Sequence, residues 1–316
     1  MDRTKFARGR KMVTDGAAAR TNRASRRRGS AKRFRDLVES ALEAKRLRGN
    51  EASSIETDRV RLRRVLPSIG HLKIRQLTSG RIERFLQELA RGDALHDPVK
   101  GATVNRFHSL LSSIFRWAKR QGLVAVNPFA GGSIPRSKES PIIPRYLGRD
   151  EQRALLRAIR RECPKKALEV ELAILTGMRR GEQFNAKWED WKIQEGVLYV
   201  SGKTGPREVQ INRAARRCLA RLRKRALREQ IFITPERNES PRDARLWFED
   251  AVKKADLRPA FRYHDLRHTY CSRLVAAGVP LLEVQKLAGH KSFQTTLRYS
   301  HLSPDQLKRA VEKVQF

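Results

Sequence analysis

The sequence has few cysteines and no long apolar run. Its three cysteines, Cys163, Cys218 and Cys271, are odd in number and show no Cys-x-x-Cys spacing, which argues against a disulfide framework and a zinc ribbon. No apolar stretch approaches the roughly 20 residues of a transmembrane helix. The basic N-terminus is not followed by the apolar segment of a signal peptide. We therefore expect a cytoplasmic protein that is not held in a membrane.

Acidic residues are scarce relative to basic ones. The chain has 34 Asp and Glu against 69 Lys and Arg, a formal net charge of +35 and a pI near 11.2. This imbalance far exceeds what solubility requires and predicts a polyanionic partner such as nucleic acid. No Gly-x-x-x-x-Gly-Lys-Ser/Thr phosphate loop is present, so nothing in the sequence indicates nucleotide-driven chemistry.

A length of 316 residues allows two domains, each with its own core. Residues 1–30 carry ten basic and two acidic residues and few large apolar ones, which predicts a basic, flexible arm. Residues 31–126 show helical periodicity and form the first expected domain. A stretch rich in Pro, Gly and Ser, 127–145, predicts a linker, and 146–316 forms the second domain.

The apolar patterns predict a mainly α, two-domain protein with a small antiparallel sheet. Four helical segments are expected in the first domain, around 34–42, 55–66, 82–89 and 104–117. In the second domain two β-rich runs, 197–200 and 207–211, flank a Gly- and Pro-containing turn. This pattern predicts a hairpin with Lys203 at its tip.

The segment Thr176–Glu182 places a glycine turn, then Arg179 and Arg180, at the end of an apolar helix. Glu182 lies three residues after Arg179 and is able to hold its guanidinium. A guanidinium fixed in this way can bind two phosphate oxygens. Taken alone, the pair is more typical of a surface ion pair.

The run His264-Asp265-Leu266-Arg267-His268 carries a second cationic group. His264 and Arg267, spaced i and i+3, share one helical face that we expect to line a groove, whereas Leu266 faces inward. His264 and His268 have the spacing of a metal pair, but the Glu of a zincin motif is absent and Arg267 lies between them. We expect no metal site.

Further along the chain, Pro280 and Gly289 bracket a predicted helix and place His290 just beyond its end. Ser292 is expected to cap a next helix that carries Tyr299. An isolated tyrosine is usually part of a core. A phenol near histidines and arginines in a strongly basic protein nevertheless suggests attack by tyrosine on a phosphodiester.

Taken in order, these motifs resemble those of tyrosine recombinases of the phage-integrase family. The matches are Thr-Gly-x-Arg-x-Gly-Glu around Arg179, Gly-Lys at Lys203, His-x-x-Arg-His from His264, and Leu-x-Gly-His followed by Tyr299. More loosely, Thr103–Arg106 and Ile114–Ala118 resemble the family's four-helix, SAM-like core-binding domain. Each motif alone is weak, but the ordered set is specific.

The resemblance implies a site-specific recombinase that cleaves and rejoins DNA through a 3′-phosphotyrosyl intermediate, without metal or other cofactor. It implies double-stranded DNA with paired recombination sites, a homotetramer on DNA and accessory or directionality factors as partners. The tail helix after Ser300 is expected to dock on a neighbouring protomer, as in the family's tetramers, although its apolar stripe is equally compatible with packing on its own chain. The implied residues are catalytic Arg179, Lys203, His264, Arg267, His290 and Tyr299, supporting Glu182 and His268, and DNA-binding Arg106, Arg116, Lys119 and Arg180.

Three other functions are compatible with parts of the pattern. A type IB topoisomerase also combines a tyrosine with cationic groups and relaxes supercoils without joining two sites. A DNA-binding regulator could retain the fold without activity. An architectural nucleic-acid binder explains the net charge of +35 but not the ordered catalytic set.

Overall fold

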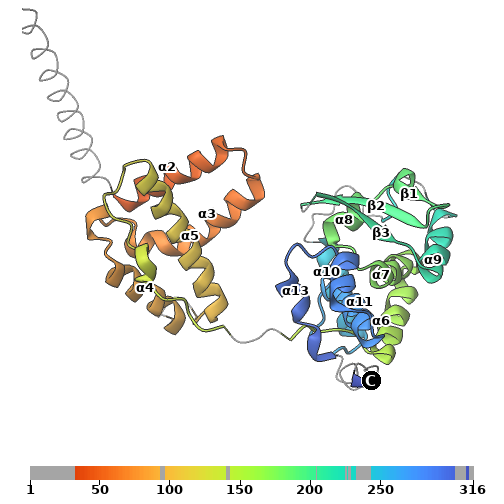
Figure 1. Ribbon diagram of the computed structural model, residues 1–316. Coiled ribbons are helices and arrows are strands. Elements are labelled where there is room, and N and C mark those ends of the chain that lie inside the picture. Colours follow the sequence, from red (N-terminus) through yellow and green to blue (C-terminus); the bar gives the residue numbers. More distant parts are fainter. Residues whose placement is uncertain are drawn as a thin grey trace, which may run out of the picture. The chain divides into compact units, whose positions relative to one another are not determined.

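The computed structural model separates the chain into two compact units, Met1–Pro141 and Ile142–Phe316 (Figure 1). The expected basic arm, 1–30, and most of the expected tail helix lie outside the described residues. The structure describes residues 33–92, 97–139, 143–203, 205–224, 226, 229–232, 243–302 and 311–312.

In the described part of the first unit, four α-helices pack around one core, as the apolar periodicity predicted. Phe34 at the start of the first helix stacks on Phe115 of the last, with ring centroids 5.6 Å apart. Thr78 caps the third by accepting from Arg81 N at 3.3 Å. The helices are α2 (Phe34–Leu47), α3 (Ala52–Ile69), α4 (Ser79–Arg91) and α5 (Gly101–Arg120), with short 3-10 turns η1 (Ile74–Gln76) and η2 (Ala130–Gly132).

Part of the stretch that was predicted as a linker packs on α5. The buried Asn105 side chain donates to Ser137 O at 2.9 Å and accepts from Ser137 N at 2.9 Å. A Cβ at Gly101 would lie 2.4 Å from Lys138 O, so only glycine allows this approach of the two backbones. Residues up to Glu139 therefore belong structurally to the first unit.

The second unit is mostly helical with a small antiparallel sheet, which confirms the predicted fold class. Its strands, in the order β1-β2-β3, are β1 (Trp191–Lys192), β2 (Val197–Gly202) and β3 (Gly205–Gln210). β2 and β3 form the expected hairpin, which closes at Gly202 and Gly205; β1 was not predicted. The helices are α6 (Arg149–Glu162), α7 (Pro164–Thr176), α8 (Arg180–Asn185), α9 (Arg213–Arg223), α10 (Asp243–Lys254), α11 (Asp265–Ala276), α12 (Leu281–Ala288) and α13 (Phe293–Leu297), with η3 (Trp188–Asp190) and η4 (Ser300–Leu302).

Helix α7 is the central element of this unit. Val170 and Ala173 pack in a core with α6, α10 and α11, whereas Leu168 and Leu172 pack in a second core with the sheet and α9. A helix that is apolar on several faces is typically buried. The loop that follows α7 is therefore held by two cores at once. Within the described part of the chain, no helix has the length and apolar character needed to span a bilayer.

Candidate active site

The site begins at the C-terminal end of α7. Gly177 adopts a left-handed conformation, φ +59°, and a Cβ there would lie 2.1 Å from the Tyr270 ring. Glycine is therefore required both for the turn and for the close packing on α11. The turn places Arg179 at the N-cap of α8.

Glu182 is the buried anchor of this corner, with 1% of the residue exposed. Its carboxylate accepts from Arg179 Nη1 at 2.7 Å and from Arg179 N at 2.8 Å. It also accepts from Arg207 Nη2 at 2.9 Å and Arg207 Nε at 3.2 Å. Burial alone raises the pKa of Glu182, but the hydrogen bonds from Arg207 and Arg179 outweigh it and lower the pKa below its ordinary value. The group is thus a carboxylate between two cations.

The two adjacent arginines of the motif point to different surroundings. Arg179 Nη2 donates to the carbonyl of Gly289, at the end of α12. Arg180 lies over the Phe184 ring, 5.7 Å from its centroid. Of the two, only Arg179 reaches the segment that carries His290.

Arg267 on α11 is 4% exposed and lies between two chain turns. It donates to Gly177 O at 2.7 Å and to Ala288 O at 2.5 Å. The expectation that it shares an open groove face with His264 was wrong, because His264 is exposed at the N-cap of α11 whereas Arg267 is buried. Burial, and then the nearby charge of Arg179, lower the pKa of Arg267 to about 10, which leaves it charged at neutral pH.

The turn after α12 agrees with its sequence pattern. Pro280 is the N-cap, Gly289 is the left-handed C-cap, and His290 follows directly. His290 N donates to Gln285 O at 3.0 Å, and its Nδ1 lies 2.9 Å from Thr296 Oγ1. These contacts fix the imidazole beside the carbonyls that hold Arg179 and Arg267.

Tyr299 lies beyond α13, which ends at Leu297, so the prediction that this helix carries it was wrong. Ser292 occupies the predicted N-cap position but makes no side-chain capping bond. The Tyr299 ring is 0% exposed and packs with Cys271 on α11. Its Oη lies 2.5 Å from His268 Nδ1, and its ring is parallel to that of His290 at 6.3 Å.

The buried position determines the protonation of these groups. Burial, with Cys271 nearby, raises the pKa of Tyr299 above its ordinary value, so the phenol keeps its proton at neutral pH. Burial, and then the charges of Arg267 and Arg179, lower the pKa of His290 to about 3. Burial, and then His264, lower the pKa of His268 to about 4. Both imidazoles are therefore neutral and able to accept a proton or a hydrogen bond.

Lys203 is exposed next to the closing pair of the hairpin. A Cβ on the preceding Gly202 would lie 3.0 Å from Glu182 Cγ. The turn end of the hairpin therefore packs directly on the Arg179–Glu182 corner, and Lys203 follows directly in the turn.

Three of the predicted DNA-binding residues belong to the first unit. Arg106, Arg116 and Lys119 are exposed on α5 of the first unit, and Lys119 Nζ donates to the carbonyl of Ala125. The His264 and His268 rings meet edge to face, 5.2 Å between centroids. Among the described residues, no group of three or more His, Cys, Asp or Glu is placed to hold a metal ion.

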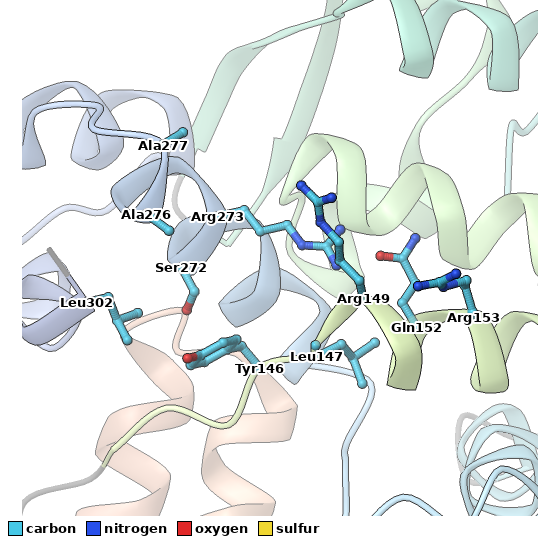
Figure 2. Close-up of a pocket in the computed structure, with 11 residues that line it drawn as sticks. Tyr146, Leu147, Arg149, Gln152, Arg153, Ser272, Arg273, Ala276, Ala277 and Leu302 are labelled. Atoms are coloured by element: carbon cyan, nitrogen blue, oxygen red, sulfur yellow. The ribbon is translucent and has the colours of Figure 1, made fainter.

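A separate hollow of about 860 Å³ lies on another face of α11 (Figure 2). Ser272 and Arg273 border it together with Tyr146, Arg149 and Leu302. It contains none of the predicted site residues. The first half of α11 thus contributes Arg267 and His268 to the candidate site, and the second half contributes Ser272 and Arg273 to this hollow.

Sequence reasoning missed two residues of this site. Arg207 follows a proline in an apparently ordinary strand, and only its pairing with Glu182 distinguishes it. Cys271 appears in the sequence as an isolated cysteine, yet it is buried against Tyr299. Its spacing of three from His268 was the available signal, since both lie on one face of α11.

The chain is similar in sequence to known integrases and tyrosine recombinases. The model of the phage integrase family matches residues 145–306. A tyrosine recombinase of Thermosipho africanus is 25% identical over 273 residues, 85% of this chain and 95% of the relative. The integrase of Salmonella phage P22 is 28% identical over 272 residues, covering 76% of this chain and 67% of its own length.

Solved structures show the same fold. An integrase of transposon Tn1549, in complex with transposon right end DNA, superposes with a TM-score of 0.72 at 20% identity, covering 90% of this chain and 99% of that one. A lambda integrase dimer bound to a core site gives 0.69 at 22% identity, covering 84% and 97%. Because the family model spans the whole cluster from Arg179 to Tyr299, the chain belongs to the phage integrase family of tyrosine recombinases, which cleave and rejoin DNA.

Proposed function

We propose that Tyr299 is the nucleophile of this recombinase and that it forms a 3′-phosphotyrosyl bond with DNA. Its Oη bonds to phosphorus while the bond from phosphorus to the 5′ oxygen breaks. The phenolic proton passes to an imidazole, and Lys203 gives a proton to the leaving 5′ oxygen. The energy of the phosphodiester is kept in the ester, so rejoining is the reverse attack by a 5′-hydroxyl.

One observation carries this proposal. Tyr299 Oη contacts His268 at 2.5 Å and its ring lies parallel to His290, whose turn also accepts from Arg179 and Arg267. Two guanidiniums beside the phenol can stabilise the charge that develops on the nonbridging oxygens in the transition state. His268, neutral and already in contact with the phenol, is the first acceptor of its proton. His264 contacts the ring of His268 at the exposed end of α11.

The ring of Tyr299 is inaccessible in the described state, with 0% exposed. Attack on a DNA phosphate therefore requires movement of the segment that follows His290. The contacts that such a movement must break are the bond to His268 and the packing on Cys271. We propose that binding of DNA supplies the free energy for this movement.

Double-stranded DNA with paired sites is the proposed substrate, with the first unit and the second unit clamping the duplex. A lambda integrase dimer bound to a core site and a lambda integrase tetramer bound to a Holliday junction support a tetrameric reaction by analogy. Accessory factors and docking of the tail on a neighbouring protomer belong to the same proposal. Sequencing of DNA captured covalently by the purified protein tests it. Capture without a preferred site would favour topoisomerase-like relaxation.

Binding is expected to depend steeply on salt. The net charge of +35 and the exposed Arg106, Arg116 and Lys119 predict that most contacts are made to phosphates. Six to ten such contacts lower the affinity by about 10³–10⁵ between about 50 and 200 mM salt. Titration of labelled duplex at several salt concentrations measures this slope, and a flat response contradicts a phosphate-dominated interface.

Replacement of Lys203 with alanine is expected to slow cleavage by about 10²–10⁴-fold, the usual contribution of a general acid. A substrate with sulfur in place of the bridging 5′ oxygen has a better leaving group and is expected to restore the rate. Rates of covalent adduct formation on the two substrates are the measurement. Lys192→Ala, on β1 of the same sheet, is the control. Absence of rescue removes Lys203 from the acid role.

A further inference from the structure

Arg207 on β3 lies behind the proposed phosphate-binding groups and is directed at protein atoms. Its side chain is 13% exposed. Nη2 and Nε donate to the two oxygens of Glu182, at 2.9 and 3.2 Å. Nη1 donates to Leu287 O at 3.0 Å, at the end of α12. The described contacts thus engage all three guanidinium nitrogens.

Through Glu182, Arg207 acts on Arg179. The carboxylate of Glu182 is shared between the two guanidiniums, and Arg179 Nη1 donates to Oε1 at 2.7 Å. When a buried carboxylate loses one of two cations, the cost of its uncompensated charge favours a two-pronged hydrogen bond with the remaining guanidinium. Without Arg207, Glu182 is therefore expected to draw Arg179 away from the phosphate position.

Through the end of α12, Arg207 also acts on the turn that carries His290. A Cβ at Gly289 would lie 2.6 Å from Arg207 Cδ. The carbonyl of Gly289 in turn accepts from Arg179 Nη2. One side chain thus connects the strand that leads from the Lys203 hairpin, the Arg179–Glu182 corner and the His290 turn.

We propose that Arg207 is a positioning residue that sets Arg179 and the His290 turn in place relative to the Lys203 hairpin, without contacting DNA. This inference rests on the proposed function. Its physical basis is preorganisation: a displacement of about 1 Å in a group that binds the transition state can cost about a hundredfold in rate.

A double-mutant cycle tests the inference. Arg207→Met is expected to lower the rate constant of adduct formation at saturating DNA by about 10–100-fold, with a change of less than about threefold in the half-saturating DNA concentration. In an Arg179→Ala background the same substitution is expected to cost clearly less than in the wild type, because one of the two groups on which it acts is gone and only the His290 turn remains. Equal losses in both backgrounds overturn the proposal.

Two further readouts separate positioning from other roles. If Arg207 only supports folding, its loss lowers the fraction of protein that reacts but leaves the rate constant of the reacting fraction unchanged. That result overturns the proposal. If Arg207 contacts phosphate, Arg207→Met lowers the salt slope of binding by about one, which also overturns it. Arg216→Met, an exposed arginine on α9, is the charge-matched control and is expected to leave the rate constant unchanged.

Arg207→Lys gives the same test where the methionine variant folds poorly. It keeps the charge but loses the two-pronged contact with Glu182, and a loss of about 3–10-fold is expected, again smaller in the Arg179→Ala background. If the wild-type protein forms no adduct, the proposed function and this inference both fail. Adduct in the wild type with no loss in either variant overturns the positioning role alone.

Discussion

Tyr299→Phe is expected to abolish the covalent protein–DNA adduct and to leave DNA binding unchanged. The substitution removes one oxygen and keeps the buried ring that packs with Cys271. Only the phenolic oxygen can form the ester, so complete loss of the adduct is expected, with no residual activity. A nicked or suicide substrate, followed by denaturing electrophoresis, measures the adduct. Binding is measured on the same duplex by a mobility shift.

Tyr270→Phe is the matched control for this variant. Tyr270 lies in the same apolar cluster on α11, and its ring packs on Gly177. Its hydroxyl has no role in the proposed chemistry, so full adduct formation is expected. Adduct that persists in Tyr299→Phe, or disappears equally in both variants, contradicts the assignment of the nucleophile.

Arg267→Gln is expected to lower the rate constant of adduct formation by about 10²–10³-fold, or roughly 3–4 kcal/mol of transition-state stabilisation. Arg267 is charged at neutral pH and is held by Gly177 O and Ala288 O. These two hydrogen bonds fix the guanidinium before a phosphate is bound. Single-turnover kinetics at saturating DNA measure the loss.

The loss of Arg267 also leaves these two buried carbonyls without their donor. We therefore expect thermal unfolding at a lower temperature, by an amount that corresponds to about 1–3 kcal/mol. Arg273→Gln is the control, because Arg273 lies on the same helix but borders the separate hollow (Figure 2). A rate defect of similar size in Arg273→Gln would mean that general loss of charge, and not placement at the phosphate, explains the effect.

In the mechanism we propose, the described structure is that of a resting enzyme. Tyr299, the proposed nucleophile, is protonated, fully buried and in contact with a neutral imidazole. The cationic groups, in contrast, are already fixed by carbonyls and by Glu182. In the proposed mechanism, cationic groups that are already in place and a buried phenol together keep Tyr299 from reacting with unintended phosphodiesters until DNA has been bound.

Local sequence determined a large part of this protein. Apolar periodicity was sufficient to predict the four helices of the first unit. The Gly- and Lys-containing turn between two β-rich runs was sufficient to predict the hairpin. Pro280 and Gly289 marked the bounds of α12 because their backbone preferences are intrinsic. The ordered motifs, read as a resemblance, identified the family. Each of these signals spans only a few neighbouring residues, so no long-range contact is needed to recognise it.

Tertiary structure decided what each side chain does. Arg267 and Tyr299 are buried by residues far apart from them in the chain. Tyr299 contacts His268 and not His264, and Arg207 forms an ion pair with Glu182. Both contacts join residues that are distant in sequence. The protonation of the histidines likewise follows from burial beside arginines of other segments. Sequence supplied the chemical groups and the local turns, whereas desolvation and distance, which exist only after packing, determined their charge states and partners.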